Sequence, residues 1–395
     1  MTFRSYISDL HIHIGRDMHG KPVKITGAKN LTLTSILEEA SRRKGIDLIG
    51  IIDCHVPSVQ QEMKQLIATG KAQERPDGGI QFERATLLLG SEIEVYDEHC
   101  HGPIHVLCYF PTLQSIQAFS EWLKTRMKNI TLSSQRYYGT AQELQHKVKE
   151  LSGIFIPAHV FTPFKSMYGK GVKRSLTEVF DRDLIDGIEL GLSSDTQMAD
   201  QISELHAYTF LTNSDAHSLG KMAREYQEIR MKEPSFKEFY WALHHVNGRK
   251  ITKNFGMNPK LGKYYSTVCN HCMNPLPADA ANCSACGSTK IIKGVVERIQ
   301  ELKDTEGSFK ERPPYFYQVP LEYLPKLGPK TLEKLLTTFP TEMYVIHQAT
   351  FAELTEVIST QLATMIIDMR EGKQSIQAGG GGVYGKVLPT SIKKT

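Results

Sequence analysis

The sequence predicts an α/β protein whose first part, residues 1–256, folds into a distorted, TIM-like (β/α)7 barrel. Short apolar, β-branched runs alternate there with longer amphipathic segments, and the length is close to the roughly 250 residues of a typical barrel. Such alternation indicates parallel βαβ units. An open doubly wound sheet is the alternative fold. A small cysteine-rich module and a C-terminal α-helical domain are expected to follow.

Seven runs and three amphipathic segments carry this prediction. The runs expected as strands are 6–13, 48–53, 85–95, 104–110, 153–159, 187–190 and 208–213. The segments expected as helices are 33–44, 113–128 and 141–151. The strands are rich in Val, Ile and Leu, and the helical segments repeat apolar residues at intervals of three and four.

The later part of the chain divides at changes of composition. Residues 254–263 have the composition of a linker, and residues 379–382 are four glycines. The expected units after residue 256 are a cysteine-rich module at 264–290, a helical connector at 291–312, a helical region at 313–376 and a flexible tail at 377–395.

The composition is that of a globular protein, with 40% hydrophobic and 23% charged residues. No apolar run approaches the roughly 18 residues that span a bilayer, and no signal pattern opens the chain, so a cytoplasmic location is expected. The net charge is only +4, but Lys and Arg crowd residues 165–174, 248–263 and 326–334. Local basic patches of this kind suit a phosphate-rich partner.

Histidines and carboxylates follow the predicted strands with unusual regularity. His11 and His13 occupy alternate positions of one strand, so both rings face the same side. The others lie at or just after the carboxyl ends of further strands, where parallel α/β folds place their chemistry. These residues are His55, Glu92, His105, His159, Asp215 and His217. Buried polar groups of this kind are retained when paired or bound to metal, so the pattern predicts a metal cluster.

These residues resemble the polymerase and histidinol phosphatase (PHP) superfamily in their order and spacing over roughly residues 1–250. Its first motif resembles Asp9-Leu10-His11-Ile12-His13, and its last resembles Asp215-Ala216-His217. The resemblance implies nine metal ligands: His11, His13, His19, His55, Glu92, His105, His159, Asp215 and His217. Cys54 interrupts the usual adjacent Asp-His pair, which leaves open whether Asp53 is a ligand or contacts one.

A cluster of two or three divalent metals (Zn²⁺, Mn²⁺, Mg²⁺ or Fe²⁺) would polarise a phosphoryl oxygen and activate water for phosphoester hydrolysis. Asp215, His217, Glu92 and His13 are the expected catalytic residues, with Asp215 as a bridging carboxylate by resemblance. The loop 161–175 follows His159 directly and mixes cations with aromatic rings, which hold phosphates and stack on bases respectively. The expected DNA contacts in it are Lys165, Tyr168, Lys170, Lys173 and Arg174.

Four of the seven cysteines have the spacing of a metal site. Cys269-x-x-Cys272 and Cys283-x-x-Cys286 are separated by ten residues, which predicts a closed, structural Zn²⁺ site with four thiolates. Such a metal holds together a module that is too small to have its own core.

The segment 321–336 predicts a helix, a tight turn and a second helix. Gly328 allows the turn and Pro329 can begin the second helix, whose free amide groups, with Lys330 and Thr331, suit a phosphate. This resembles the helix-hairpin-helix motif, which grips DNA backbone, and residues 351–372 resemble a degenerate second copy. An ordinary helical hairpin is the alternative.

The order of these parts is similar to that of the endonuclease Q family over nearly the whole chain. The resemblance implies a DNA repair endonuclease that cuts 5′ to deaminated bases (uracil, hypoxanthine, xanthine) or abasic sites, by extruding the lesion into a pocket. The alternatives are a PHP-type 3′–5′ exonuclease or phosphatase acting on DNA ends, and a non-catalytic nucleic-acid-binding scaffold.

Overall fold

A computed structural model describes residues 2–307, 311–373, 376–377, 379 and 385–388. Most strands belong to an 11-stranded sheet with the order β15-β12-β11-β1-β2-β5-β4-β3, in which β6 joins β5 to β8 and β7 pairs with β5. The strands of the first part are β1 (Arg4–Ile12), β2 (Leu48–Ile51), β3 (Gln73–Glu74), β4 (Ile80–Phe82), β5 (Ala85–Val95), β6 (Ile104–Phe110), β7 (Arg136–Tyr137), β8 (Ile154–Pro157), β9 (Ile188–Glu189), β10 (Phe210–Leu211), β11 (Tyr226–Met231) and β12 (Lys250–Gly256).

The expected α/β class is confirmed, and each of the seven predicted strands overlaps a strand of the structure (β1, β2, β5, β6, β8, β9 and β10). Six of these strands share one buried cluster, to which Leu10 of β1, Leu48 of β2, Leu88 of β5, Leu107 of β6, Ile156 of β8 and Leu211 of β10 contribute. Side chains from so many strands meet only where the sheet curls around a common interior. The hydrogen-bonded sheet itself remains open, because β9 pairs with β10 in a separate two-stranded sheet.

The strand pairing is mixed, whereas the sequence predicted parallel units throughout. β1 runs parallel to β2 and β2 to β5, but β6 is antiparallel to both β5 and β8. The reason is the connection between β5 and β6, which spans only residues 96–103 and contains no helix. Parallel neighbours need a crossover of a dozen residues or more, so this short loop forces a hairpin.

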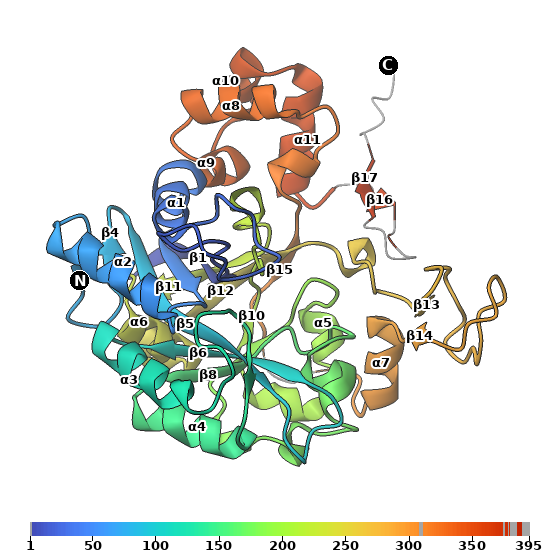
Figure 1. The fold of residues 1–395 in the computed structure, drawn as a ribbon. Helices are drawn as coiled ribbons and strands as arrows, with labels where there is room; N and C mark the ends of the chain where they lie inside the picture. Colours follow the sequence, from blue (N-terminus) through green and yellow to red (C-terminus); the bar gives the residue numbers. More distant parts are fainter. Residues whose placement is uncertain (1, 308–310, 374–375, 378, 380–384, 389–395) are drawn as a thin grey trace.

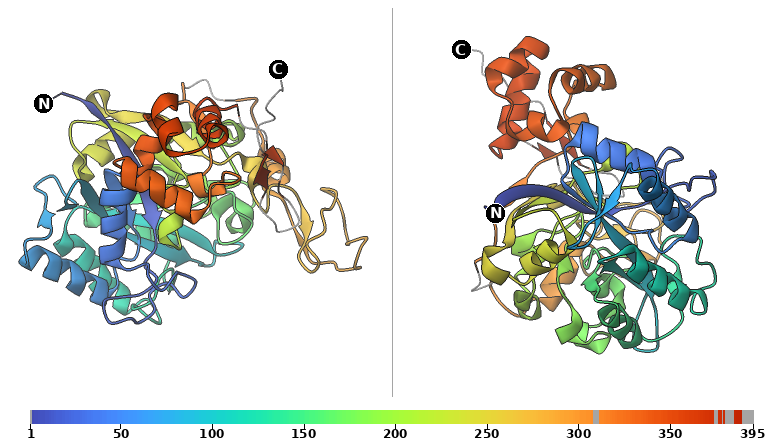
Figure 2. Two further views of the ribbon diagram at one scale, coloured as in Figure 1. Left: turned by 90° about the horizontal axis from the view of Figure 1, so that it is seen from above. Right: turned by 90° about the vertical axis from the view of Figure 1, so that its left-hand side faces the viewer.

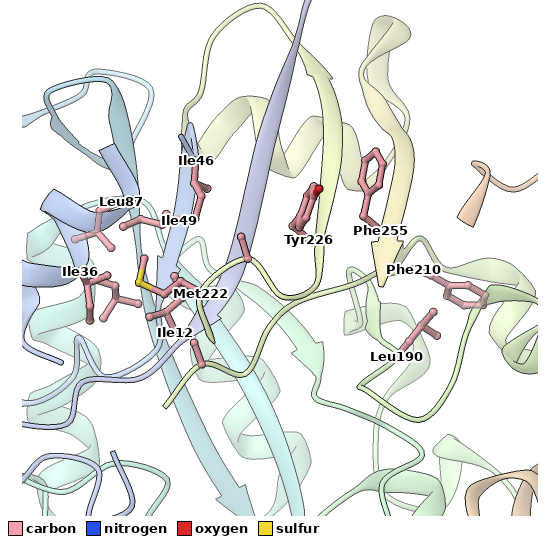
Figure 3. Packing of buried hydrophobic residues seen from close by; sticks show 14 of the residues in the cluster. Ile12, Ile36, Ile46, Ile49, Leu87, Leu190, Phe210, Met222, Tyr226 and Phe255 are labelled. Carbon is pink, nitrogen blue, oxygen red and sulfur yellow. The ribbon is translucent and has the colours of Figure 1, made fainter. Parts of the chain in front are cut away.

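Helices cover the outer face of the curled sheet. They are α1 (Leu33–Glu38), continued by a π-helical turn at Glu39–Lys44, α2 (Pro57–Ala68), α3 (Leu113–Lys124), α4 (Ala141–Glu150), α5 (Thr196–Ala199) and α6 (Phe236–Leu243). Thr32, Thr112 and Thr140 cap α1, α3 and α4 with their side chains. Figure 3 shows Ile36 of α1 close to Leu87 of β5 and Ile49 of β2 in the core beneath these helices.

The later part of the chain forms a cysteine-rich segment and a group of helices. Its elements are β13 (Val268–Cys269), β14 (Ile291–Ile292), α7 (Val295–Leu302), β15 (Tyr315–Tyr317), α8 (Pro329–Thr338), α9 (Glu342–His347), α10 (Phe351–Val357), α11 (Thr360–Arg370), β16 (Ile376–Gln377) and β17 (Lys386–Val387). The segment around β13 and β14 projects from the main body, while α8–α11 gather beside α1 (Figures 1 and 2).

Several side-chain contacts attach the C-terminal helices to the sheet domain, among them the ion pair of Arg43 with Glu333 at 2.9 Å. Lys44 and Glu342 form a buried ion pair at 2.6 Å, and Tyr226 lies 2.5 Å from the Nε2 of His347. β15 also returns to the main sheet, where it runs parallel to β12. The flexible tail was expected at 377–395, and residues 378, 380–384 and 389–395 of it lie outside the described part. In that described part, no helix is long and apolar enough to cross a membrane.

Candidate metal centre

Histidines and carboxylates from five strands or strand ends converge at one edge of the sheet. Their ligand atoms form three overlapping groups, each within 4.8 Å. The groups are His11, His13 and Glu92; His13, Asp215 and His217; and Glu92, His105 and His159. Because His13 and Glu92 each belong to two groups, the cluster is continuous and offers three adjacent positions for metal ions.

The spacing of these atoms fits metal coordination. The Nε2 atoms of His11 and His13 lie 3.5 and 3.4 Å from Oδ1 of Asp215, and Nε2 of His217 lies 3.3 Å from the same oxygen. Two ligands of a tetrahedral ion with bonds of about 2.0–2.1 Å are separated by about 3.3 Å. In addition, the Nε2 atoms of His11, His13 and His105 are buried without a hydrogen-bond partner. A metal ion would supply the missing partner of each ring.

Two buried carboxylates orient the rings of His11 and His13. The Nδ1 of His11 lies 3.0 Å from Oε1 of Glu189, and the Nδ1 of His13 lies 3.2 Å from Oδ2 of Asp53. A ring that donates from Nδ1 to a carboxylate presents Nε2 as the free acceptor, which is the form that binds metal. Asp53 therefore contacts the candidate ligand His13 at its second ring nitrogen. This contact corresponds to the second of the two roles that the sequence left open for Asp53, which were metal ligand or partner of a ligand.

The electrostatics of the cluster follow from opposite charges in a buried space. Burial alone would lower the pKa of His11, but Glu189 and Asp215 outweigh it and raise that pKa well above the usual value. Burial would raise the pKa of Glu92, yet His105 and Lys24 hold it well below its usual range. Without metal, Glu92 thus favours its ionised form and His11 holds a proton more tightly than a free imidazole does. A metal ion bound by His11 must displace that proton, so its binding is weakened by acid.

Local backbone geometry places the outer members of the cluster. His159 and Asp215 have positive φ angles of 31° and 45°, a conformation that is strained for residues other than glycine. Gly191 packs against His159, and a Cβ at Gly191 would lie 2.8 Å from the Cβ of His159. His105 does not end a strand, as the sequence predicted, but is the second residue of β6. The reversed direction of β6 brings this beginning to the same edge as the other strand ends.

Two of the nine expected ligands lie outside the three groups. His19 is exposed in the loop after β1. His55 is buried, with its Nδ1 2.8 Å from the hydroxyl of Ser91 and its Nε2 3.4 Å from the carbonyl of Leu132. The ligand role of both therefore stays a prediction.

The four predicted cysteines come together around β13. Sγ of Cys269 lies 3.6 Å from that of Cys286, and Sγ of Cys272 lies 3.5 Å from that of Cys283. These separations exclude disulfides and are close to the roughly 3.8 Å between sulfurs on one tetrahedral ion with bonds of about 2.3 Å. Backbone amides of Cys272 and His271 lower the pKa of Cys269 to about 6, which favours the thiolate.

Solved structures with the same architecture exist. The crystal structure of the novel lesion-specific endonuclease PfuEndoQ from Pyrococcus furiosus matches with a TM-score of 0.85 and 32% identity, over 99% of this chain and 97% of the other. A structure of endonuclease Q with a 27-mer duplex substrate carrying an abasic lesion at the active site matches with a TM-score of 0.84, 32% identity and coverage of 99% and 98%.

The chain belongs to the endonuclease Q family. It is accordingly a metal-dependent nuclease. An uncharacterized Bacillus subtilis protein, YqxK, is 54% identical over 382 residues, which cover 97% of this chain and 99% of the relative. The uncharacterized protein MJ0043 of Methanocaldococcus jannaschii is 35% identical over 252 residues, 58% of this chain but only 31% of that protein. No protein-family model matches the chain.

For this member of the endonuclease Q family, the loop 161–175 is only partly available to a substrate. Lys165, Lys170, Lys173 and Arg174 are exposed, as a DNA contact requires. Tyr168, in contrast, is fully buried and its hydroxyl donates to Glu204 at 2.7 Å, so its expected role on DNA is corrected. The ring of Tyr168 stacks on that of Phe161 inside the protein, with their centroids 5.3 Å apart. The mixture of aromatic and basic residues in the loop did not indicate that this ring is buried.

The predicted helical hairpin at 321–336 differs from the structure in its first half. Only a 3-10 turn, Leu321–Tyr323, precedes α8. Gly328 is the N-cap of α8 with a φ of −84°, so the turn uses the positive φ of Lys326 instead. Lys330 is exposed and Thr331 is half-buried at the first turn of α8. The segment expected as a degenerate copy does form two helices, α10 and α11.

Sequence reasoning missed Glu189, Lys24 and Ser134. Nζ of Lys24 lies 3.3 Å from Oε2 of Glu92, and the hydroxyl of Ser134 donates to the same oxygen. Glu189 ends the apolar run Gly187-Ile188-Glu189, the same kind of pattern that singled out the other carboxylates. Lys24 and Ser134 lie in irregular loops, where no periodicity marks them.

Proposed function

We propose that the chain hydrolyses DNA on the 5′ side of an abasic site or a deaminated base (uracil, hypoxanthine or xanthine). The observation that carries the proposal is the continuous ligand cluster sharing His13 and Glu92. Support for the substrate comes from endonuclease Q, which has been solved with an abasic lesion at its active site and is 32% identical. Deaminated bases share with abasic sites a weakened pairing, which lowers the cost of extruding the nucleotide.

We assign the catalytic cluster to His11, His13, His19, His55, Glu92, His105, His159, Asp215 and His217, and a structural Zn²⁺ to the four cysteines. Divalent ions at the cluster (Zn²⁺, Mn²⁺, Mg²⁺ or Fe²⁺) would polarise the phosphoryl group and activate water. The chain itself orients the rings through Glu189 and Asp53 and keeps Glu92 ionised. Lys24 adds one positive charge beside Glu92.

The alternatives predict other products. A PHP-type exonuclease or phosphatase would release mononucleotides or phosphate from ends, and a non-catalytic scaffold would release nothing. The buried, charged cluster argues against a scaffold, because carboxylates and rings are costly to bury without a partner such as a metal ion.

The deciding experiment uses duplex DNA with one abasic site or one uracil and a label inside the lesion strand. We expect one internal nick, immediately 5′ of the lesion, with Mg²⁺, Mn²⁺ or Zn²⁺ added to the full chain. The matched undamaged duplex is the control and should stay intact. Shortening from the ends, or equal cutting of the control, would contradict the proposal.

A further inference from the structure

A row of residues leads outward from the metal cluster along two paired strands. Glu94 of β5 is opposite Arg136 of β7. Two residues earlier in each segment, the hydroxyl of Ser134 donates to the carboxylate of Glu92. Alternate residues of a strand point to the same face. The face that carries Glu92 therefore continues to Tyr96, while the neighbouring segment continues to Tyr138.

The outer end of this row is an exposed stack of rings and cations. The guanidinium of Arg136 lies 4.7 Å from the ring centroid of Tyr96 and 5.3 Å from that of Tyr138. Nζ of Lys128 lies 5.8 Å from the centroid of Tyr138. The tyrosines are 37% and 46% exposed, although large rings are usually buried. We call these four residues (Tyr96, Lys128, Arg136 and Tyr138) the Tyr96–Tyr138 platform.

The two cations of the platform remain free to attract an anion. Within the described ranges, neither Arg136 nor Lys128 forms an ion pair, and Arg136 donates its hydrogen bond to the carbonyl of Tyr96. Asp97, the carboxylate next to Tyr96, accepts instead from the backbone amides of His99 and Ala141. Cations that form no ion pair among the described residues and lie beside exposed rings suit a nucleic acid strand, which offers both phosphates and bases.

We propose that the Tyr96–Tyr138 platform holds the DNA strand that flanks the lesion. Four residues of extended strand separate Glu92 from Tyr96, about 13 Å. This is about four base-pair steps of a B-form duplex at 3.4 Å each. Arg136 and Lys128 contact phosphates, and the ring of Tyr138 packs on a base or sugar. The inference rests on the proposed function, because it takes lesion-containing DNA as the substrate of the adjacent cluster.

Three variants test the platform on a fluorescein-labelled duplex with one abasic site. Tyr138→Ala and Arg136→Ala should each weaken binding about tenfold in an Asp215→Asn background, which separates binding from cleavage. In the otherwise unchanged chain, KM should rise while kcat changes less than about twofold. Arg136→Ala should also reduce the slope of log affinity against log salt by about one. Tyr138→Phe keeps the ring and should bind like the unaltered chain.

A matched control is Tyr240→Ala. Tyr240 is 40% exposed, but it lies on α6 beside Pro111 and Gly153, at the opposite end of β6 and β8 from the cluster. It should leave affinity unchanged, and circular dichroism should show all variants folded. If the unaltered chain nicks the abasic duplex but both alanine variants of the platform bind normally, the platform inference is wrong and the proposed function stands. If the unaltered chain neither binds nor nicks this duplex, the proposed function fails, and the inference with it.

Discussion

The two candidate metal sites of the molecule are built in opposite ways. One site lies at the edge of the sheet where the histidines and carboxylates converge, which we call the catalytic edge after the proposed function. His11 and His13 are fully buried there, and their rings are held by carboxylates from other parts of the chain. Around β13, Cys272 and Cys286 are exposed, and the local core consists of Cys269, Leu276 and Cys283. Two of those three core residues are themselves candidate ligands. The fold therefore shapes the first site before metal binds, whereas the small core of the second site predicts that its shape depends on metal.

We expect the largest difference between the two sites when metal is removed from the four cysteines. A structural zinc is worth about 10 kcal/mol or more to a small module, so its loss should unfold residues 264–292 while the sheet domain stays folded. Hydrogen exchange with and without a zinc chelator, and on Cys272→Ser, measures this. Cys100→Ser is the matched control, because Cys100 lies outside the cluster. Undiminished protection of 264–292 after zinc removal would contradict the expectation.

At the catalytic edge, loss of a metal ligand should lower the activity without unfolding the chain. Glu92→Gln removes the charge shared by two ligand groups, and we expect kcat to fall on the order of 10²–10³-fold. The melting temperature should change little, because the ring partners of β1 remain. Cleavage assays and metal content measure the two effects, with Glu228→Gln as a carboxylate control on β11. A collapse of the fold in Glu92→Gln would show that metal shapes this site too.

The contribution of ring orientation is expected to be smaller. Glu189→Gln keeps an acceptor for the Nδ1 of His11 but removes its negative charge, which should weaken metal binding about 10–100-fold. Titration calorimetry of the purified, metal-free chain with Mn²⁺ measures this directly. Glu238→Gln is the control, because Glu238 is equally buried but pairs with Arg249 far from the cluster. Equal metal affinity in both variants would mean that Glu189 has only a structural role.

The smallest effect concerns the sheet that supports the catalytic edge. Burial raises the pKa of Glu225 to about 8, and one of its carboxylate oxygens has no hydrogen-bond partner. The folded chain therefore keeps a proton that the unfolded chain loses above about pH 4.5. Stability from this group is complete below that pH and is lost as the pH rises towards 8.

Glu225→Gln should therefore stabilise the chain by about 2 kcal/mol at pH 8 and by much less at pH 5. Urea unfolding at both pH values measures the difference. Glu121→Gln, at an exposed position of α3, should show no such dependence on pH. An equal change at both pH values would indicate that Glu225 is ionised in the fold.

Much of the fold and the site could be predicted from sequence, because strand periodicity and ligand spacing are local patterns. The positions of the seven predicted strands and the four clustered cysteines are examples. The reversal of β6 was missed, although the predicted strands 85–95 and 104–110 leave only residues 96–103 between them, which is too short for a parallel crossover. Glu189 was missed although its position near the end of the predicted strand 187–190 is like that of the other carboxylates. Arg136 and Tyr138 were missed because their exposed positions follow no apolar period.

The hairpin of β5 and β6 limits where the sequence can accept insertions during evolution. Its seven paired positions run from Leu89 opposite Phe110 to Val95 opposite Ile104, and Glu92 and His105 both lie within them. Inserting one residue in either strand would turn every side chain beyond it to the other face and remove a ligand. The loop 96–103 carries no such constraint. Insertions there can remodel the surface next to Tyr96 while the catalytic edge keeps its geometry.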